Sequence, residues 1–285
     1  MKYYLLLCLM CCKLTFANEC EQATDSCAPI GEWKISLAVG AGVYTNPLHG
    51  GDNTPLIVIP QISYYGEKVF FENNTLGYSF FESERFIVSL ISQLNHEKAY
   101  FTSWHPQNIL IETAGGTLEL SSGDSDSDSV VSIKDVSNRR WAIDAGFQLN
   151  WFINQATDIQ ARILHDVNSV YNGLNGQIEL TRTLRTEQLP NTAMSFSIGT
   201  NINSKNLVDY YYGISKTTDP NIEYSYQGKA SISPYFRLVL THQLSERWRV
   251  KLNIKRLFLD DAMTDSPLVK DDYINTIFAG VSYDF

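Results

Sequence analysis

Hydrophobic and polar residues alternate along residues 271–285, which read DDYINTIFAGVSYDF. Counted back in twos from the end, one face carries Phe285, Tyr283, Val281, Ala279 and Ile277. Side chains two residues apart share a face of a β-strand, so this stretch predicts a strand. A last strand that ends on an aromatic residue is typical of an outer-membrane β-barrel. An ordinary buried strand at the end of a soluble fold would show the same alternation.

The same alternation recurs along the chain, for example in residues 33–43 and in residues 141–151, whose apolar face has a Trp at each end. A lipid-facing barrel strand needs such an apolar face opposite small or polar residues, although a β-sandwich strand also alternates. We predict an all-β fold, a single transmembrane antiparallel β-barrel of about 12 strands, with about 10 to 14 as the range. The predicted strands are 33–43, 55–65, 68–73, 75–81, 85–94, 139–151, 157–165, 175–186, 192–202, 229–242, 247–258 and 271–285.

The joints between these strands alternate between short turns and longer polar segments. The longer segments are 44–54, 95–138, 166–174, 203–228 and 259–270. Outer-membrane barrels have short periplasmic turns and long outer loops, so both chain ends are expected on the periplasmic side. The acidic run Asp124–Asp128 is predicted to be a solvated loop tip, because it lacks the Gly and Glu that an EF-hand calcium loop needs.

Three residues interrupt the strand pattern. Arg182 falls on the apolar face of strand 175–186, which indicates either a bulge or a place near the membrane interface where a long basic side chain reaches polar surroundings. Pro60 and Pro234 lie inside predicted strands. Proline cannot donate to a β-ladder, so both are expected at strained or bulged places.

The N-terminus has the features of an export signal. Lys2, an apolar run of about ten residues and Ala17 describe a signal peptide over residues 1–17, since the run is too short to span a bilayer. A lipoprotein signal at the cysteines at positions 11 and 12 is an alternative that the preceding residues fit poorly. Residues 18–32 are expected to be a periplasmic N-terminal segment and residues 33–285 the barrel. Cys20 and Cys27 are predicted to form a disulfide in an oxidising compartment, with two free thiols as the alternative.

Charge limits the partners of the exported chain. The whole sequence has 22 basic and 31 acidic residues, and residues 1–17 contain two lysines and no acid. Export therefore leaves 20 basic against 31 acidic residues, a net charge of −11. This excess of negative charge argues against nucleic acid as a partner.

Four basic residues fall on the inward face of two neighbouring predicted strands: Arg237, Arg249, Lys251 and Lys255. Cations gathered on a low-dielectric wall would favour anions in an open pore. The alternative is that inward acids pair with them and fill the barrel, and the inward acids in these segments are Asp144, Asp158 and Glu179. We predict a basic lumen wall with small or no conductance, because about twelve strands lie between filled small barrels and open large ones.

Catalytic and metal-binding motifs are not found among the five histidines. His165 with Asp166 and Ser169 could form a Ser/His/acid site, but a triad is defined by geometry that the sequence does not contain. His96 and His105 flank a loop, and a metal site there would need a further ligand. The prediction is a protein without catalytic, cofactor-binding or metal-binding residues, and so not an enzyme.

Several short motifs resemble the MipA/OmpV family of outer-membrane proteins. They are Gly40-x-Gly42-x-Tyr44, Gly50-Gly51-Asp52, Pro60-Gln61-Ile62-Ser63-Tyr64 with Phe70-Phe71, Tyr211-Tyr212-Gly213-Ile214-Ser215, Asp265-Ser266-Pro267-Leu268-Val269 and Gly280-x-Ser282-Tyr283-x-Phe285. Each is weak alone, but they follow the family's order over nearly the whole mature chain. Where the family often has an Ala-Gly pair, this chain has Tyr226-Gln227-Gly228-Lys229, so any ligand of that loop is not carried over.

The resemblance implies a single barrel in the outer membrane of a Gram-negative bacterium, in contact with its lipid. It also implies a non-catalytic role as a scaffold between a lytic transglycosylase, which degrades murein, and a murein synthase. Other members of the family are porin-like or adhesive. A narrow anion-preferring porin or a surface adhesin is therefore the alternative, because a fold does not fix a function.

Overall fold

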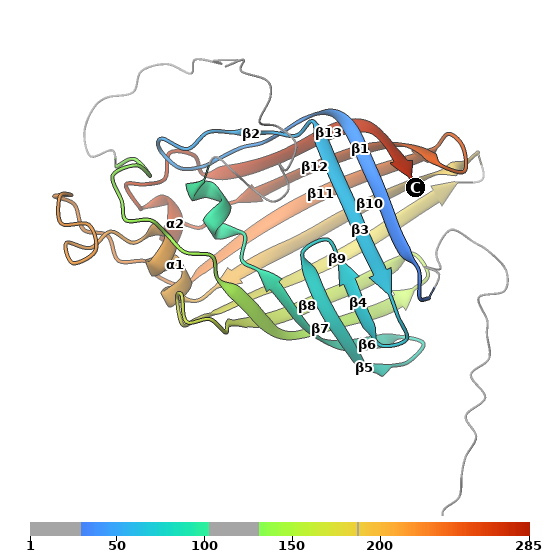
Figure 1. Cartoon of the computed structure of the whole chain (residues 1–285), viewed down its shortest axis with the longest axis horizontal. Coiled ribbons are helices and arrows are strands. Elements are labelled where there is room, and N and C mark those ends of the chain that lie inside the picture. Colours follow the sequence, from blue (N-terminus) through green and yellow to red (C-terminus); the bar gives the residue numbers. More distant parts are fainter. Residues whose placement is uncertain (1–29, 103–130, 187) are drawn as a thin grey trace, which may run out of the picture.

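The computed structural model describes residues 30–102, 131–186 and 188–285, and most of them form β-strands (Figure 1). The elements in chain order are β1 (Trp33–Tyr44), β2 (Thr54–Pro55), β3 (Val58–Tyr65), β4 (Val69–Glu72), β5 (Thr75–Glu82), β6 (Phe86–Leu94), the 3-10 helix η1 (Glu97–Phe101), β7 (Ile143–Asn154), β8 (Thr157–Asp166), β9 (Leu174–Thr186), β10 (Leu189–Asn203), α1 (Lys205–Tyr212), β11 (Ser231–Gln243), β12 (Trp248–Phe258), α2 (Asp261–Thr264) and β13 (Tyr273–Asp284). Cys20 and Cys27 lie outside the described residues, as do the predicted signal peptide and the acidic run.

The strands form a closed 12-strand antiparallel barrel. The short β2 and the longer β3 both pair with β1 and act as one interrupted strand. The last strand, β13, pairs with β1 from Ser36 opposite Asp284 to Tyr44 opposite Thr276, which closes the sheet. The predicted fold class and strand number are confirmed, and the uncertain region 68–81 is two strands, β4 and β5.

Glycines from the two ends of the chain meet at this closure. Gly40 of β1 lies directly opposite Gly280 of β13. A Cβ atom on Gly40 would lie 2.5 Å from the Cα atom of Gly280, closer than any side chain can approach. The close contact of these two strands therefore requires glycine, as is usual where one backbone approaches another.

The outward face of the barrel is apolar and accessible, as the alternation predicts. Phe147 and Ile163, on neighbouring strands, are each 55% exposed. Arg182 also faces outward, without a bulge, and its guanidinium donates to the Thr157 hydroxyl at 2.8 Å. Thr157 is the first residue of β8, after a short turn. The interface explanation for Arg182 is therefore the one that holds.

The two prolines do not bulge their strands, so the bulge, one of the two predicted alternatives, is wrong. The β1–β3 register runs without a shift through Pro60, and the β10–β11 register runs without a shift through Pro234. Both residues instead lie where the ladder on one side has ended. Pro234 comes just before Tyr235, where pairing with β12 begins, and β4 pairs with β3 only at residues 63–65. A missing N–H costs no ladder bond at such a place.

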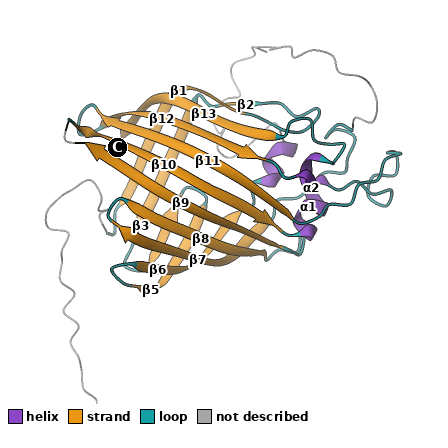
Figure 2. Ribbon diagram, turned by 180° about the vertical axis from the view of Figure 1, so that it is seen from behind, coloured by secondary structure: helices purple, strands orange, loops and turns teal. Residues whose placement is uncertain are grey.

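The deepest core of the described residues lies at one end of the barrel, in the long loops. We call this end the loop end and the packed loops the cap. The buried members of the cap are Leu48, Tyr100, Val131, Ala142, Val170, Tyr171, Leu207, Val208, Tyr211, Tyr212, Ile214, Ile222, Leu259, Met263, Leu268 and Ile274. They come from all five long loops and from the start of β13, at the loop end. The helices α1 and α2 lie with them beyond the strand ends (Figure 2).

The cap corrects the prediction that these segments are merely polar. Tyr211 and Tyr212 are 0% exposed, and polar contacts join one loop to another around them. Arg139 donates to the Gly213 carbonyl at 2.9 Å, and the Asp219 carboxylate accepts from the Ser137 amide at 2.6 Å. A set of loops that share a core and satisfy one another's backbone is an ordered layer over the end of the lumen.

The opposite end, which we call the turn end, has only short joints between strands. The joint between β7 and β8 is residues 155–156, and the joint between β11 and β12 is residues 244–247. β13 also ends here, and Phe285 is 76% exposed (Figure 1). Among the described residues, no helix has the length and hydrophobicity needed to cross a membrane.

Candidate functional site

The described residues line a cavity toward each end of the barrel lumen. The vestibule, at the turn end, has a volume of about 770 Å³ and reaches the rim at Glu246 and Phe285. The subcap cavity has a volume of about 400 Å³ and is lined by Tyr44 of β1 and by Tyr100 of the cap. Gln61 lines both cavities and marks where they approach each other.

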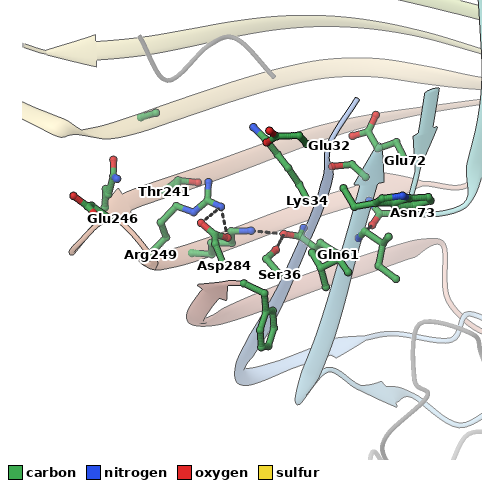
Figure 3. A pocket seen from close by; sticks show the side chains of 18 of the residues that line it. Glu32, Lys34, Ser36, Gln61, Glu72, Asn73, Thr241, Glu246, Arg249 and Asp284 are labelled. Carbon is green, nitrogen blue, oxygen red and sulfur yellow. Dashed lines mark hydrogen bonds and ion pairs between the residues drawn. The ribbon is translucent and has the colours of Figure 1, made fainter. Parts of the chain in front are cut away.

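Two of the four predicted basic residues, Arg249 and Lys251, line the vestibule. The Arg249 guanidinium forms an ion pair with the carboxylate of Asp284 from β13 (Figure 3). The Lys251 ammonium donates to Gln61 Oε1, which also accepts from the Ser36 hydroxyl at 3.3 Å. These contacts join β12 to β13, β1 and β3 across the closure of the barrel.

The other two basic residues lie further along the lumen, and the register places Arg237 directly opposite Lys255. Arg237 pairs with Glu179 at 2.5 Å, and the Tyr235 hydroxyl donates to the same carboxylate at 2.7 Å. The Lys255 ammonium lies 4.2 Å from the centre of the Tyr235 ring. A cation over an aromatic face is stabilised by the ring quadrupole, so Lys255 is held without a carboxylate partner.

A belt of polar contacts continues from this group around the inner wall. Gln177 bonds the Tyr235 hydroxyl and accepts from Arg162 at 2.6 Å. Arg162 reaches on to Gln93 of β6 at 3.1 Å. We call residues 93, 162, 177, 179, 235 and 237 the lumen belt. It lies at the level of the subcap cavity, because Gln177 is opposite Asn201 and Arg237 is opposite Lys255, and both Asn201 and Lys255 line that cavity.

The lumen therefore combines paired and unpaired cations. Arg237 and Arg249 have carboxylate partners, whereas Lys251 and Lys255 form no ion pair within the described part of the chain. Asp284 was missing from the inward acids predicted from the sequence. Its position on the polar face of the last strand was the available signal, since inward and outward residues alternate strictly.

The subcap cavity is lined by a half-buried carboxyl that the sequence did not single out. Glu97, on η1, accepts from the Tyr212 hydroxyl of α1 at 2.5 Å, and the Tyr44 and Tyr100 hydroxyls bond each other at 2.6 Å nearby. Burial raises the pKa of the Glu97 carboxyl to about 7, with Asp144 adding to the rise and the Tyr212 bond opposing it. No strand periodicity extends into η1, so its partners could not be read from the sequence.

Asp166 and Asp144 fix the loop after β8, and the considered Ser/His/acid triad does not assemble. Asp166 is buried and its carboxylate accepts from the backbone amides of residues 168, 170, 171 and 172. His165 is exposed on the other face of the strand. The Tyr171 hydroxyl donates to Asp144 at 2.6 Å, which ties the same loop to β7.

His105, the second histidine considered for a metal site, lies outside the described residues. Within the described ranges, no group of three or more His, Cys, Asp or Glu residues is arranged to hold a metal ion.

Comparison with known proteins gives a family match over most of the chain. The family described as MltA-interacting protein MipA matches residues 38–285. The MltA-interacting protein of Escherichia coli K12 is 24% identical over 264 residues, covering 92% of this chain and 95% of that protein. The putative outer membrane protein YiaT of the same strain is 25% identical over 252 residues, covering 87% and 91%.

Among solved structures, OmpT, an outer membrane protein of Vibrio cholerae, is similar with a TM-score of 0.37 and 9% identity, covering 90% of this chain and 100% of that one. This likeness is too distant to carry an argument about function.

Proposed function

The chain belongs to the MltA-interacting protein MipA family, and from this premise we propose that it is a non-catalytic scaffold that binds murein-remodelling enzymes at its turn end. The protein is an outer-membrane β-barrel. Barrels of this kind have short periplasmic turns, so the turn end faces the periplasm and the cap faces outward. A relative at 24% identity is named for its interaction with MltA. The expected partners are a lytic transglycosylase and a murein synthase.

The contrast between the two ends of the lumen carries this proposal. The loop end is covered by the cap, while the larger cavity, the vestibule, reaches the periplasmic rim. Acidic and basic side chains share its wall, including Glu32, Lys34 and Arg249 (Figure 3). A concave surface with charges of both signs suits a polar segment of a partner protein, because electrostatic complementarity selects partners and fixes their orientation.

The test is retention of a purified lytic transglycosylase by the full-length barrel in lipid nanodiscs. The charge reversals Lys34→Glu and Arg185→Glu, which change two exposed vestibule residues, are expected to weaken retention at least about tenfold. Arg140→Glu, an equal reversal at an exposed residue of the loop end, is the matched control and should retain the enzyme. If the full-length barrel retains no murein enzyme, the scaffold proposal is wrong.

Deletion of residues 18–31, which keeps the vestibule residue Glu32, locates the docking surface. Loss of retention on deletion alone assigns docking to the N-terminal segment with Cys20 and Cys27, whereas loss with the two charge reversals alone assigns it to the vestibule. Either result keeps the scaffold role and decides which part of the periplasmic surface performs it.

A second candidate function is a narrow anion-preferring pore. The observation that favours it is the lack of ion pairs at Lys251 and Lys255 in the described lumen. The cap covers the outer end, so small or no conductance is expected. Planar-bilayer recording in a salt gradient tests this function: a cation-selective reversal potential rejects it, and an anion-selective one that Lys251→Glu reverses supports it.

A further inference from the structure

The barrel wall has a notch beside β3, where one neighbour stops early. β4 has four residues, and it pairs with β3 only at residues 63–65. The β4–β5 hairpin turns at Asn73, whose amide donates to the Ile62 carbonyl at 2.8 Å. β3 continues past the hairpin toward the loop end (Figure 1), and its residues 58–61 pair, within the described part of the chain, only with β1. We call the space bordered by residues 58–61, Asn73 and η1 the notch.

The backbone of β3 at the notch has fewer groups that need a hydrogen-bonding partner strand. Both the amide and the carbonyl of Ile62 bond Asn73, so they face the hairpin. Backbone groups alternate along a strand, so Pro60 presents its backbone to the same side. Proline has no N–H, and one donor that would otherwise be unsatisfied is therefore absent. The proline is placed as it is on natural edge strands, where pairing has to be avoided.

The notch lies at the depth of the lipid. Ile57, which directly precedes β3 on the loop-end side of Pro60, is 42% exposed, and Ile62 of β3 on its turn-end side is 37% exposed. On the far side of the hairpin, Leu76 of β5 is 54% exposed. Exposed apolar side chains on both borders belong to the lipid-facing band of a barrel, so the notch opens within that band and not above it.

The subcap cavity lies directly behind the notch. Its lining includes Pro60 and Asn73 of the notch border, together with Glu97 and Ala99 of η1. It also includes lumen residues of β12, among them Asn253 and Lys255. A single cavity thus runs from the lipid-facing edge of β3 to the inner wall of the barrel, and its volume of about 400 Å³ is within the range of small-molecule sites.

The lining of this cavity has the chemistry of a site for an amphipathic anion. Its apolar part is formed by residues from three strands, from the joint between β2 and β3 and from η1, namely Leu56, Ile59, Tyr100, Leu257, Ile274 and Phe278. At its inner end, Lys255 has a positive charge and no ion pair among the described residues. Asn253 Oδ1 is buried and accepts no hydrogen bond from the described residues. A buried acceptor without a donor is costly, and a bound hydroxyl or N–H would remove that cost.

We propose that the subcap cavity binds a small amphipathic carboxylate, with its charge at Lys255 and a hydroxyl or N–H at Asn253, and that the ligand enters sideways from the membrane through the notch. This inference is independent of the scaffold role, which uses the other end of the lumen. The apolar body of the ligand would lie along Ile59 and Phe278. Burial favours the neutral form of Glu97, so that carboxyl does not repel the ligand below pH of about 7.

Binding is tested with the barrel in lipid vesicles, using 11-(dansylamino)undecanoate as the fluorescent probe and 3-hydroxydecanoate, decanoate and decanol as competitors. Lys255→Met is expected to weaken 3-hydroxydecanoate at least about tenfold and decanol by less than about twofold. Lys216→Met is the matched control, since Lys216 is an exposed lysine of the loop end that is not among the residues lining either cavity. Asn253→Leu should abolish the preference for 3-hydroxydecanoate over decanoate. Equal affinity in Lys255→Met and wild type overturns the site.

The entry route is tested by the rate at which probe already dissolved in the bilayer binds. Pro60→Trp places bulk at the notch, and Ile62→Trp places the same bulk two residues away on the same outward face of β3. Pro60→Trp is expected to slow the association rate at least about tenfold without changing the equilibrium affinity. Ile62→Trp is expected to change the association rate less than about twofold. Heat-modifiable migration on a gel verifies that both fold. Equal rates in the two variants overturn lateral entry and assign entry to the vestibule.

Discussion

The cap and the vestibule stand at opposite ends of one barrel and are built in opposite ways. The cap joins five long loops around a core in which Tyr211 and Tyr212 are 0% exposed. The vestibule is a cavity of about 770 Å³, and its side chains are held by single ion pairs and amide contacts, such as Arg249 with Asp284. Burial makes the cap sensitive to any change in volume, whereas the vestibule can change its charge at small cost. The loop end therefore supplies closure, and the turn end is free to serve binding.

The largest effect is expected from emptying the cap. Tyr211→Ala removes a fully buried ring and its bond to the Arg140 carbonyl. The opening free energy of the cap should fall by about 3–5 kcal/mol. Hydrogen exchange of the α1 amides measures the loss. Tyr224→Ala, at a residue 43% exposed in the same loop, should change it by less than about 0.5 kcal/mol. Equal effects of the two substitutions would mean that the cap is not a core.

A pH effect of nearly this size is expected at Glu97. Its pKa is raised from 4.5 to about 7 in the folded state, so between these values the folded cap binds more protons than the open one. The contribution of Glu97 to the opening free energy of the cap is then fully present below pH 4.5. It is lost as the pH rises to about 7, which lowers the opening free energy by roughly 3 kcal/mol. The groups around the carboxyl are Tyr44 of β1, Tyr100 of η1, Tyr212 of α1 and Asp144 of β7.

Hydrogen exchange of η1 and α1 between pH 4.5 and 8 measures this dependence once the intrinsic exchange rate is divided out. Glu97→Gln keeps a neutral amide in place of the carboxyl and should remove most of the decrease in the opening free energy between pH 4.5 and 7. A wild-type cap that is equally stable at pH 5 and pH 8 would contradict the assignment.

The smallest effect on stability is expected in the vestibule. Asp284→Asn removes the partner of Arg249, but both side chains are about a third exposed, at 37% and 28%. Ion pairs that water reaches are worth about 0–1 kcal/mol, so unfolding in urea should change by no more than that. The variant adds one unit of positive charge to the lumen, and any conductance should become more anion-selective. A loss of stability as large as that expected for Tyr211→Ala would mean that the vestibule is as sensitive to substitution as the cap.

The barrel could be predicted from the sequence because strand periodicity is local. Trp33–Val43 already shows which residues face the lipid, and the register of β1 on β3 and β13 agrees with it. The cap could not be predicted in this way. Leu48, Tyr100, Tyr211 and Leu268 come from four loops without a common period, and only the closed barrel brings those loops together.

The candidate site was partly predictable for the same reason. Inward positions of Arg237, Arg249, Lys251 and Lys255 follow from alternation along two strands. Their partners follow from register across several strands, so the contact of Lys251 with Gln61 joins residues 190 positions apart. The notch depends on the length of β4, and strand boundaries are what a sequence determines least well.

Accessibility of the vestibule from the two sides of the membrane tests the central claim, that the lumen opens at the turn end and is covered at the loop end. Thr241→Cys places a thiol in the vestibule, and Tyr224→Cys places one on the exposed outer loop. Both are made with Cys20 and Cys27 replaced by Ser. A polymer-linked maleimide added to intact cells should label Tyr224→Cys only. After the outer membrane is permeabilised, it should label both. Labelling of Thr241→Cys in intact cells would contradict the account.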